Sequence, residues 1–353
     1  MKTENPALIL LRILSVILIG FIPMVGYSQE AGSCAENLKT AQSLFDRGKV
    51  EMVPSTISNC LKSGFTREES LTAYKLIIQS YLFEEKQDLA DSTMLAFLKK
   101  NPEYQLSPTD HSSFVRLFNT FRVKAVVQLS FHIGSNIPFL TGVSPVYVSG
   151  KPVESNYNSE FPNIYLSLEA KFEINKKMEV NIEAAYSQLR FTNTLQITDP
   201  DKGITTYTET QKRIEIPVSL TYNFKSFGKF TPYGRLGAGP ALSMGSTASV
   251  DFKPTDLNGT PHTGPDLNRD ASRISLDIFA QAGAGVKYKT RGGYFFTELR
   301  SNFGFLNQVV WADNIPEVGE LAGFYYYADD GFRLNAFNFT IGYTQIFYKP
   351  SKR

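Results

Sequence analysis

The 353-residue sequence has little of what catalysis, redox chemistry or metal binding requires: it contains two cysteines, three histidines and one tryptophan. No Cys and His spacing of a metal site occurs, and no histidine has an assignable serine or acid partner. An excess of charge of one sign is also missing, since 36 Lys and Arg oppose 34 Asp and Glu, without a basic run suited to nucleic acid. The composition therefore predicts a non-catalytic chain without cofactor, metal or nucleic-acid partner.

Long hydrophobic runs are confined to the N-terminus. A basic start precedes an apolar run, 13–26, and Gly26 and Ser28 supply small residues at positions −3 and −1. This pattern predicts a secretory signal peptide over residues 1–28. A membrane anchor is the first alternative, but the run is too short to span roughly 30 Å of hydrocarbon. A lipoprotein at Cys34 is the second, disfavoured because polar residues separate this cysteine from the apolar run.

Both cysteines, Cys34 and Cys60, lie in the exported part of the chain. In an oxidising compartment such a pair more often forms a disulfide than stays reduced. The sequence therefore favours a Cys34–Cys60 bond, with two isolated buried thiols as the alternative. Closing a loop of about 26 residues would stabilise the fold by ~3 kcal/mol.

Residues 29–122 have the apolar periodicity of helices, and an offset of 37 residues pairs Ala41 with Ile78 and Val53 with Ala90. The better-defined copy carries its motif residues at Tyr74, Ile77, Tyr81, Ala90 and Pro102. With these residues the segment resembles tetratricopeptide repeats. The resemblance implies a module of antiparallel helix pairs with a surface for a peptide or partner protein. A compact spacer without a ligand is the alternative.

The repeat pattern carries three local expectations. Cys34 begins the first helix and Cys60 ends the second, so that a helical hairpin brings the two together. An inserted loop lies near 66–70. A further helix, 112–121, is capped by Asp110 and closes the stack.

Beyond Val123 the apolar period changes from helical to two: Leu166 and Leu168, for example, alternate with Ser167 and Glu169. One apolar face opposite a charged face is typical of membrane barrels, where lipid lies outside. The pattern predicts an all-β transmembrane barrel of eight antiparallel strands within residues 123–353. The expected strands lie near 123–134, 161–174, 178–193, 206–224, 229–242, 273–288, 293–307 and 334–348.

The connections between these strands alternate in length. Short ones are expected at 175–177, 225–228 and 289–292, and long polar ones at 135–160, 194–205, 243–272 and 308–333. With an even number of strands, both ends of the barrel lie on the side of the short turns. These turns face the periplasm in outer-membrane barrels. The helical module is therefore expected in the periplasm.

A secreted β-sandwich is the competing fold, because it also consists of alternating strands. The predicted strands are long for a sandwich, and aromatic residues gather in two girdles of the kind that a bilayer favours. One girdle, at the short-turn end, comprises Phe172, Phe224, Phe227, Phe230, Tyr288, Tyr294, Phe347 and Tyr348. The other comprises Phe131, Phe161, Phe191, Tyr207, Phe305 and Trp311.

The last expected strand, 337–348, is rich in aromatic residues and resembles the C-terminal signal read by barrel-assembly machinery. Together with the strand pattern and the preface 118–122, it makes the chain similar to small porin-like outer-membrane β-barrel proteins. These are of OmpA or OmpX size and include PorT-like proteins of gliding and secretion systems. The resemblance implies outer-membrane lipid and the barrel-assembly machinery as partners, and a further periplasmic or outer-membrane protein partner.

The barrel interior is expected to contain a charge network. Glu169, Glu183, Arg235, Glu298 and Arg300 occupy inward positions at mid-height. Charges in a narrow interior must be paired, so these five are predicted to close the lumen. The alternatives are a selective ion pore, or an enzyme of the kind that small barrels build around a rim histidine, for which His132 is the inward candidate.

The sequence thus predicts a non-catalytic outer-membrane protein that anchors a periplasmic helical interaction module, within a secretion, motility or assembly apparatus. A narrow pore or passive transporter is one alternative. Surface adhesion through the loops 243–272 and 308–333 is the other.

Overall fold

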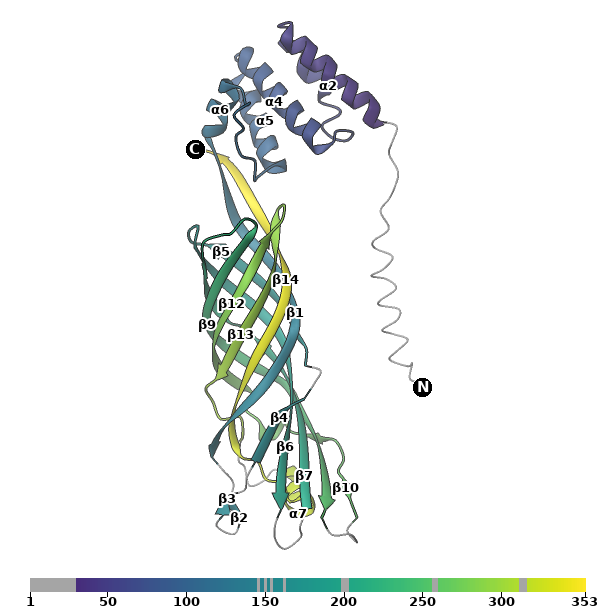
Figure 1. Ribbon diagram of the computed structural model, residues 1–353, viewed down its shortest axis with the longest axis vertical. Helices are drawn as coiled ribbons and strands as arrows, with labels where there is room; N and C mark the ends of the chain where they lie inside the picture. Colours follow the sequence, from purple (N-terminus) through teal and green to yellow (C-terminus); the bar gives the residue numbers. More distant parts are fainter. Residues whose placement is uncertain are drawn as a thin grey trace. The chain divides into compact units, whose positions relative to one another are not determined.

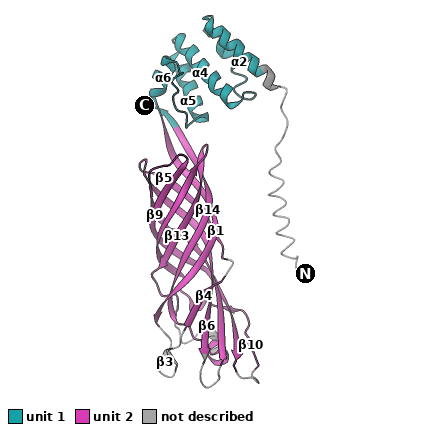
Figure 2. Ribbon diagram, viewed as in Figure 1, with its two compact units in different colours: residues 1–122, 350–353 teal, residues 123–349 magenta. Residues whose placement is uncertain are grey.

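The computed structural model describes residues 30–144, 147–148, 151–152, 155–160, 163–197, 203–255, 260–310 and 316–353. The predicted signal peptide, 1–28, lies outside these residues. The chain divides into two compact units, one of residues 1–122 with 350–353 and one of residues 123–349 (Figure 2). The sequence assigned residues 350–353 to the barrel, but they belong to the helical unit: Lys352 pairs with Asp91, and the Arg353 amide donates to Thr120.

From residue 30 onward, the helical unit contains six helical segments, of which Figure 1 labels α2, α4, α5 and α6. They are α2 (Glu30–Asp46), the 3-10 turn η1 (Val50–Met52), α3 (Val53–Ile57), α4 (Arg67–Phe83), α5 (Gln87–Lys100) and α6 (Ser112–Asn119). Helices α2, α3 and α4 share a core around Ala41, Ile57, Ala73 and Ile77. Among the described residues, no helix is both long and apolar enough to cross a membrane.

The disulfide Cys34–Cys60 joins α2 to the turn that follows α3. The two cysteines do not lie at helix ends as predicted. Helix α2 begins at Glu30, and α3 ends at Ile57, three residues before Cys60. The turn ends at Gly64, whose positive φ of 113° suits a residue without a Cβ.

Two other local expectations are wrong for identifiable reasons. The expected loop at 66–70 is the start of α4, because Thr66 and Glu69 form a capping box. Helix α6 is capped by His111, whose Nδ1 accepts from the Ser113 amide. Asp110 binds Lys75 instead and so does not cap the helix. Helix α6 ends at Asn119, since Phe121 already begins the first strand.

In its described residues, the second unit contains an antiparallel sheet of twelve strands and a separate pair of two short strands. Its long strands are β1 (Phe121–Ser144), β5 (Tyr165–Glu173), β6 (Met178–Ile197), β7 (Gly203–Glu215), β8 (Val218–Asn223), β9 (Phe230–Pro254), β12 (Leu276–Lys289), β13 (Gly293–Gly304) and β14 (Gly331–Lys352). The loops contain the short strands β2 (Tyr147–Val148), β3 (Lys151–Pro152), β4 (Ser155–Ser159), β10 (His262–Thr263) and β11 (Leu267–Asn268). They also contain the 3-10 turn η2 (Asp270–Ser272) and helix α7 (Pro316–Tyr325).

The sheet closes into a barrel. Strands β9, β12, β13, β14, β1, β5 and β6 pair in this order, and both β7 and β8 pair with β6 on one side and β9 on the other. Each of the eight predicted ranges contains strand, but the range 206–224 holds two, β7 and β8. They are separate because Pro217 lies between them and has no amide hydrogen to donate.

Several predicted long loops are in fact strand. Strands β1, β6, β7 and β9 continue into the ranges 135–160, 194–205 and 243–272. On β6 and β9 the character of the two faces changes near these extensions: Phe191 and Val250 are buried inside, whereas Arg190 and Thr247 are exposed outside. Apolar residues inside and polar residues outside are what water requires, so this part of the barrel lies beyond the lipid-facing band.

The prediction of two aromatic girdles is confirmed in part. Near the short connections, Phe172, Phe224, Phe227, Phe230 and Phe347 are 43–67 % exposed, as a lipid-facing belt requires, but Tyr294 is buried. At the other end Phe131 and Phe305 are exposed, whereas Phe191 and Tyr207 face the interior because they lie beyond the lipid-facing band. Phe161 and Trp311 lie outside the described residues.

Removal of the disulfide by Cys34→Ala with Cys60→Ala should destabilise the helical unit by ~3 kcal/mol, because the 26-residue separation would no longer be closed in the unfolded chain. Urea unfolding of the detergent-folded full chain, followed by circular dichroism at 222 nm, measures this. Reduction of the wild type should reproduce the shift. An unchanged helical transition would contradict the expectation.

Candidate functional site

The structure brings the five predicted interior charges together inside the barrel. They come from β5 (Glu169), β6 (Glu183), β9 (Arg235) and β13 (Glu298 and Arg300), and each is at most 2 % exposed. Arg300 contacts Glu183 and Glu298, at 2.7 Å in each case. Arg235 pairs with Glu169 and lies 3.3 Å from Glu298 and 3.6 Å from Glu183. Each arginine thus bridges carboxylates from different strands across the lumen.

Two further residues belong to this central network. The Lys171 ammonium and the His132 Nε2 each lie 3.1 Å from Glu169 Oε2. With Lys171 included, three cations face three carboxylates, so their charges balance. The cations are Lys171, Arg235 and Arg300, and the carboxylates are Glu169, Glu183 and Glu298. The sequence signal for Lys171 was its position two residues from Glu169, on the same face of β5. His132 comes from β1, and only the pairing of β1 with β5 shows that it meets Glu169.

Other polar layers fill the lumen on both sides of this network. Toward the short connections, Lys287 binds both oxygens of Glu179 at 2.9 and 2.8 Å. Toward the long loops, Gln308 donates to Asp277 at 2.8 Å, and Arg213 lies 3.6 Å from the same carboxylate. All five side chains are buried.

The loop end of the lumen is closed by an arginine clamp and an apolar cluster. Arg273 lies 2.6 Å from Glu209 and 2.8 Å from Asp329, and Arg269 also pairs with Asp329. Beside them Tyr207 stacks on Tyr327 with ring centroids 4.1 Å apart. Leu321 of α7 packs into the same cluster. The interior is therefore occupied by side chains from the short connections to the loops.

His132, the inward candidate of the enzyme alternative, belongs to the interior network. Its ring contacts Glu169 and the edge of Phe296, with centroids 4.6 Å apart, and it is fully buried. Within the described parts of the chain, no three His, Cys, Asp or Glu side chains are placed to hold a metal ion.

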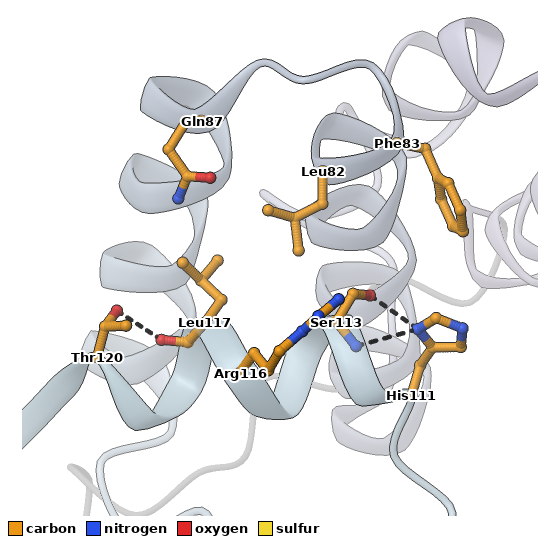
Figure 3. A pocket seen from close by; sticks show the side chains of 8 residues that line it. All are labelled: Leu82, Phe83, Gln87, His111, Ser113, Arg116, Leu117 and Thr120. Carbon is orange, nitrogen blue, oxygen red and sulfur yellow. Dashed lines mark hydrogen bonds between the residues drawn. The ribbon is translucent and has the colours of Figure 1, made fainter.

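The helical unit has an open groove of about 480 Å³ (Figure 3). Leu82 and Leu117 point into the same space from α4 and α6 (Figure 3). Phe83 is 58 % exposed at the side of the groove, and its ring lies 6.1 Å from that of His111. The groove is lined by Leu82, Phe83, Gln87, His111, Ser113, Arg116, Leu117 and Thr120. This lining contains exposed Arg116 and no carboxylate.

A partly buried ion pair holds α6 against α4 behind the groove. The Lys75 ammonium lies 2.5 Å from Asp110, which also accepts from the Tyr104 hydroxyl and the Ser107 amide, both at 2.7 Å. Burial alone would raise the pKa of Asp110, but the hydrogen bonds from Lys75, Tyr104 and Ser107 outweigh it and lower the pKa. The ionised carboxylate therefore stabilises the start of α6.

A closed antiparallel barrel with an apolar outer band and a paired polar interior defines a transmembrane β-barrel protein. Comparison with known families agrees, since residues 108–309, more than half of the chain, match the family described as outer membrane protein beta-barrel domain. The chain belongs to this family, and the prediction of an outer-membrane barrel is confirmed. The match begins ahead of α6 and so includes it.

Solved structures with similar folds include the Neisserial surface protein A, at 15 % identity and a TM-score of 0.28, covering 65 % of this chain and 97 % of that one. The attachment invasion locus protein Ail of Yersinia pestis has 12 % identity and a TM-score of 0.25, covering 62 % and 99 %. The outer-membrane protein AlkL has 10 % identity and a TM-score of 0.33, covering 69 % and 96 %. Comparison with curated proteins gives no match.

Arg235→Leu should lower the stability of the barrel by about 3–5 kcal/mol, because it leaves Glu169 and Glu298 buried without their shared cation. The urea midpoint for loss of the heat-modifiable band on gels measures this. Lys212→Leu, which removes an exposed cation, is the matched control and should shift the midpoint little. Equal effects of both changes, or steady conductance of the wild type in planar bilayers, would contradict a paired and closed interior.

Asp110→Asn should lower the stability of the helical unit by about 1–3 kcal/mol at pH 7, because it removes the ion pair with Lys75. Since folding lowers the pKa of Asp110, its contribution is present above the unfolded value of about 3.9 and is lost as pH falls through the folded pKa. Urea titrations at pH 7 and pH 2 should show the wild type and variant converging in acid. Asp88→Asn on the exposed face of α5 is the control, and a pH-independent difference would contradict the assignment.

Proposed function

We propose that this chain is a non-catalytic outer-membrane protein that anchors a periplasmic, tetratricopeptide-like helical unit, and that the groove of this unit docks a partner protein. The barrel would cross the membrane with eight strands, β7 and β8 counting as one. The short connections and both ends of the barrel would face the periplasm, because outer-membrane barrels place short turns there. The setting would be a secretion, motility or assembly apparatus of the envelope.

The contrast between the filled lumen of the barrel and the open groove of the helical unit supports this proposal. The lumen is filled by paired side chains, each network member being nearly inaccessible. The groove is open, and it combines the apolar surface of Leu82, Phe83 and Leu117 with the exposed cation of Arg116. Aromatic residues, Phe among them, and arginine are enriched at protein–protein interfaces. Passage of a solute has no comparable support from the barrel.

The residues that line the groove indicate which kind of partner segment would bind there. Arg116 and His111 are the ionisable residues of the groove, and neither is matched by a carboxylate in the lining. A segment with an apolar side chain followed by an Asp, a Glu or a terminal carboxylate would bury its apolar group between Leu82 and Leu117. Its carboxylate would then pair with the guanidinium, the charge-assisted bond for which arginine is best suited.

Site-specific cross-linking in the native envelope tests this proposal. A photoreactive residue at Phe83 should give one defined protein adduct, whereas the same residue at Leu89, exposed on α5 outside the groove, should not. Arg116→Glu should reduce the adduct by roughly tenfold, which corresponds to ~1.4 kcal/mol. Lys62→Glu, the same charge reversal at an exposed site outside the lining, should leave it unchanged.

The controls separate this function from the alternatives. Equal adducts at both positions, or no response to Arg116→Glu, would contradict docking in the groove. Loss of cell-surface binding on trimming the long loops, with cross-linking absent, would favour adhesion.

A further inference from the structure

The short-connection end of the barrel carries a ring of exposed cations. Three connections join β5 to β6, β8 to β9 and β12 to β13, and two of the cations lie in or directly beside each connection, Lys289 being the last residue of β12. The six residues, here called the basic rim, are Lys176, Lys177, Lys225, Lys229, Lys289 and Arg291, and all are exposed. Because these connections follow every second strand around the barrel, the cations are distributed around its circumference and do not form one patch.

The exposed charged side chains at the short-connection end are mostly cationic. Lys124 and Lys349 at the ends of β1 and β14 are also exposed. Among the described residues of this end, the exposed carboxylate is Glu173, whereas Glu179 is buried against Lys287. No carboxylate in the described chain pairs with Lys176, Lys177 or Arg291. At the long-loop end, by contrast, exposed Arg190, Lys212 and Lys253 are mixed with Asp251, Asp266 and Asp270.

The height of the basic rim along the barrel is set by the aromatic belt beside it. Phe224 directly precedes Lys225, Phe230 directly follows Lys229, and Tyr288 directly precedes Lys289. The aromatic side chains are exposed on the lipid-facing surface, so the cations lie one or two residues beyond the hydrocarbon. The Lys229 ammonium lies 5.9 Å from the ring of Tyr288. This is the level of lipid headgroups, which long cationic side chains reach from the edge of the apolar zone.

The connections hold these cations in ordered turns. The Asn175 side chain accepts from the amides of Lys177 and Met178 at 2.9 and 3.0 Å. Gly228 and Gly292 have φ values of 62° and 75°, which tight hairpins require and glycine adopts without strain. The rim is therefore presented at a constant level by the fold itself.

We propose that the basic rim binds the headgroups of anionic phospholipids in the leaflet on the short-connection side. The phosphodiester of such a lipid supplies the negative charge that the protein lacks at this level. Polybasic sites beside a membrane gain about one kcal/mol per cation from anionic lipid, or roughly fivefold in affinity. A ring around the barrel fits the annulus of lipid that surrounds it, whereas one docked protein segment would reach only part of the ring.

Reconstitution of the exported full chain in phosphatidylcholine nanodiscs, with and without phosphatidylglycerol, tests the proposal. Spin-labelled phosphatidylglycerol should associate with the wild type several-fold more strongly than spin-labelled phosphatidylcholine, and added salt should weaken the preference. The triple variant Lys176→Gln, Lys177→Gln, Arg291→Gln should lose most of it. The matched control Arg190→Gln, Lys212→Gln, Lys253→Gln removes three cations at the other end and should retain it.

The outcomes decide between sources of binding. An equal loss in both triple variants would show a general charge effect and overturn the proposal, as would a wild type without preference. If the rim variant kept its lipid preference but lost a cross-linked envelope protein, the rim would be a protein contact. Should the rim variant fail to fold on the heat-modifiability assay, the single variants and the salt titration of the wild type give the same decision. The result is independent of the groove, which these changes do not touch.

Discussion

Closure of the hydrogen-bonded sheet is the constraint on which the rest of this structure depends. A peptide group without a partner in hydrocarbon costs several kcal/mol, so a spanning sheet must pair its last strand with its first. Strands β14 and β1 are neighbours, and β7 and β8 join β6 to β9 on the opposite side. A ring of this size is narrow, and its inward side chains meet one another across the lumen. Glutamates and arginines placed there must pair or remain uncompensated, which is why the central network links β5, β6, β9 and β13.

The environment changes along the strands and explains their residue pattern. On β6, Asn181 and Glu183 face inward within the lipid-facing band, and Leu189 and Phe191 face inward farther along. The outward-facing neighbours change from apolar to charged, from Ile182 to Arg190. The strand keeps its alternation, while the surroundings of its outer face change from lipid to water. Beyond this point an apolar cluster, into which α7 packs through Leu321, lies beside the buried ion pairs of Arg273.

Because side chains fill the barrel interior, the binding surfaces that we propose lie outside the lumen. The helical unit presents a groove with apolar and cationic residues, the short connections present a ring of cations, and the two features differ in form. The groove is concave and local, as suits a peptide, whereas the ring is distributed at the level of headgroups, as suits lipid. Neither depends on passage through the lumen. In the functions proposed above, the barrel is the membrane anchor, and the groove and the ring provide the specificity.

The sequence by itself determined the features that follow from local periodicity and composition. Alternation such as that of Leu166 and Leu168 with Glu169, together with long strands and two aromatic girdles, predicted a membrane barrel. Strand parity placed Arg235 and Arg300 on the inner face, because side-chain direction in a strand has a period of two. Tertiary structure decided what depends on partners distant in the chain. Only strand pairing shows that His132 meets Glu169, and only the fold shows that Asp110 binds Lys75 and leaves the helix cap to His111. Periodicity reports the side on which a residue lies. Which residue it meets there, and whether lipid or water lies opposite, is decided by the register and height of the assembled strands.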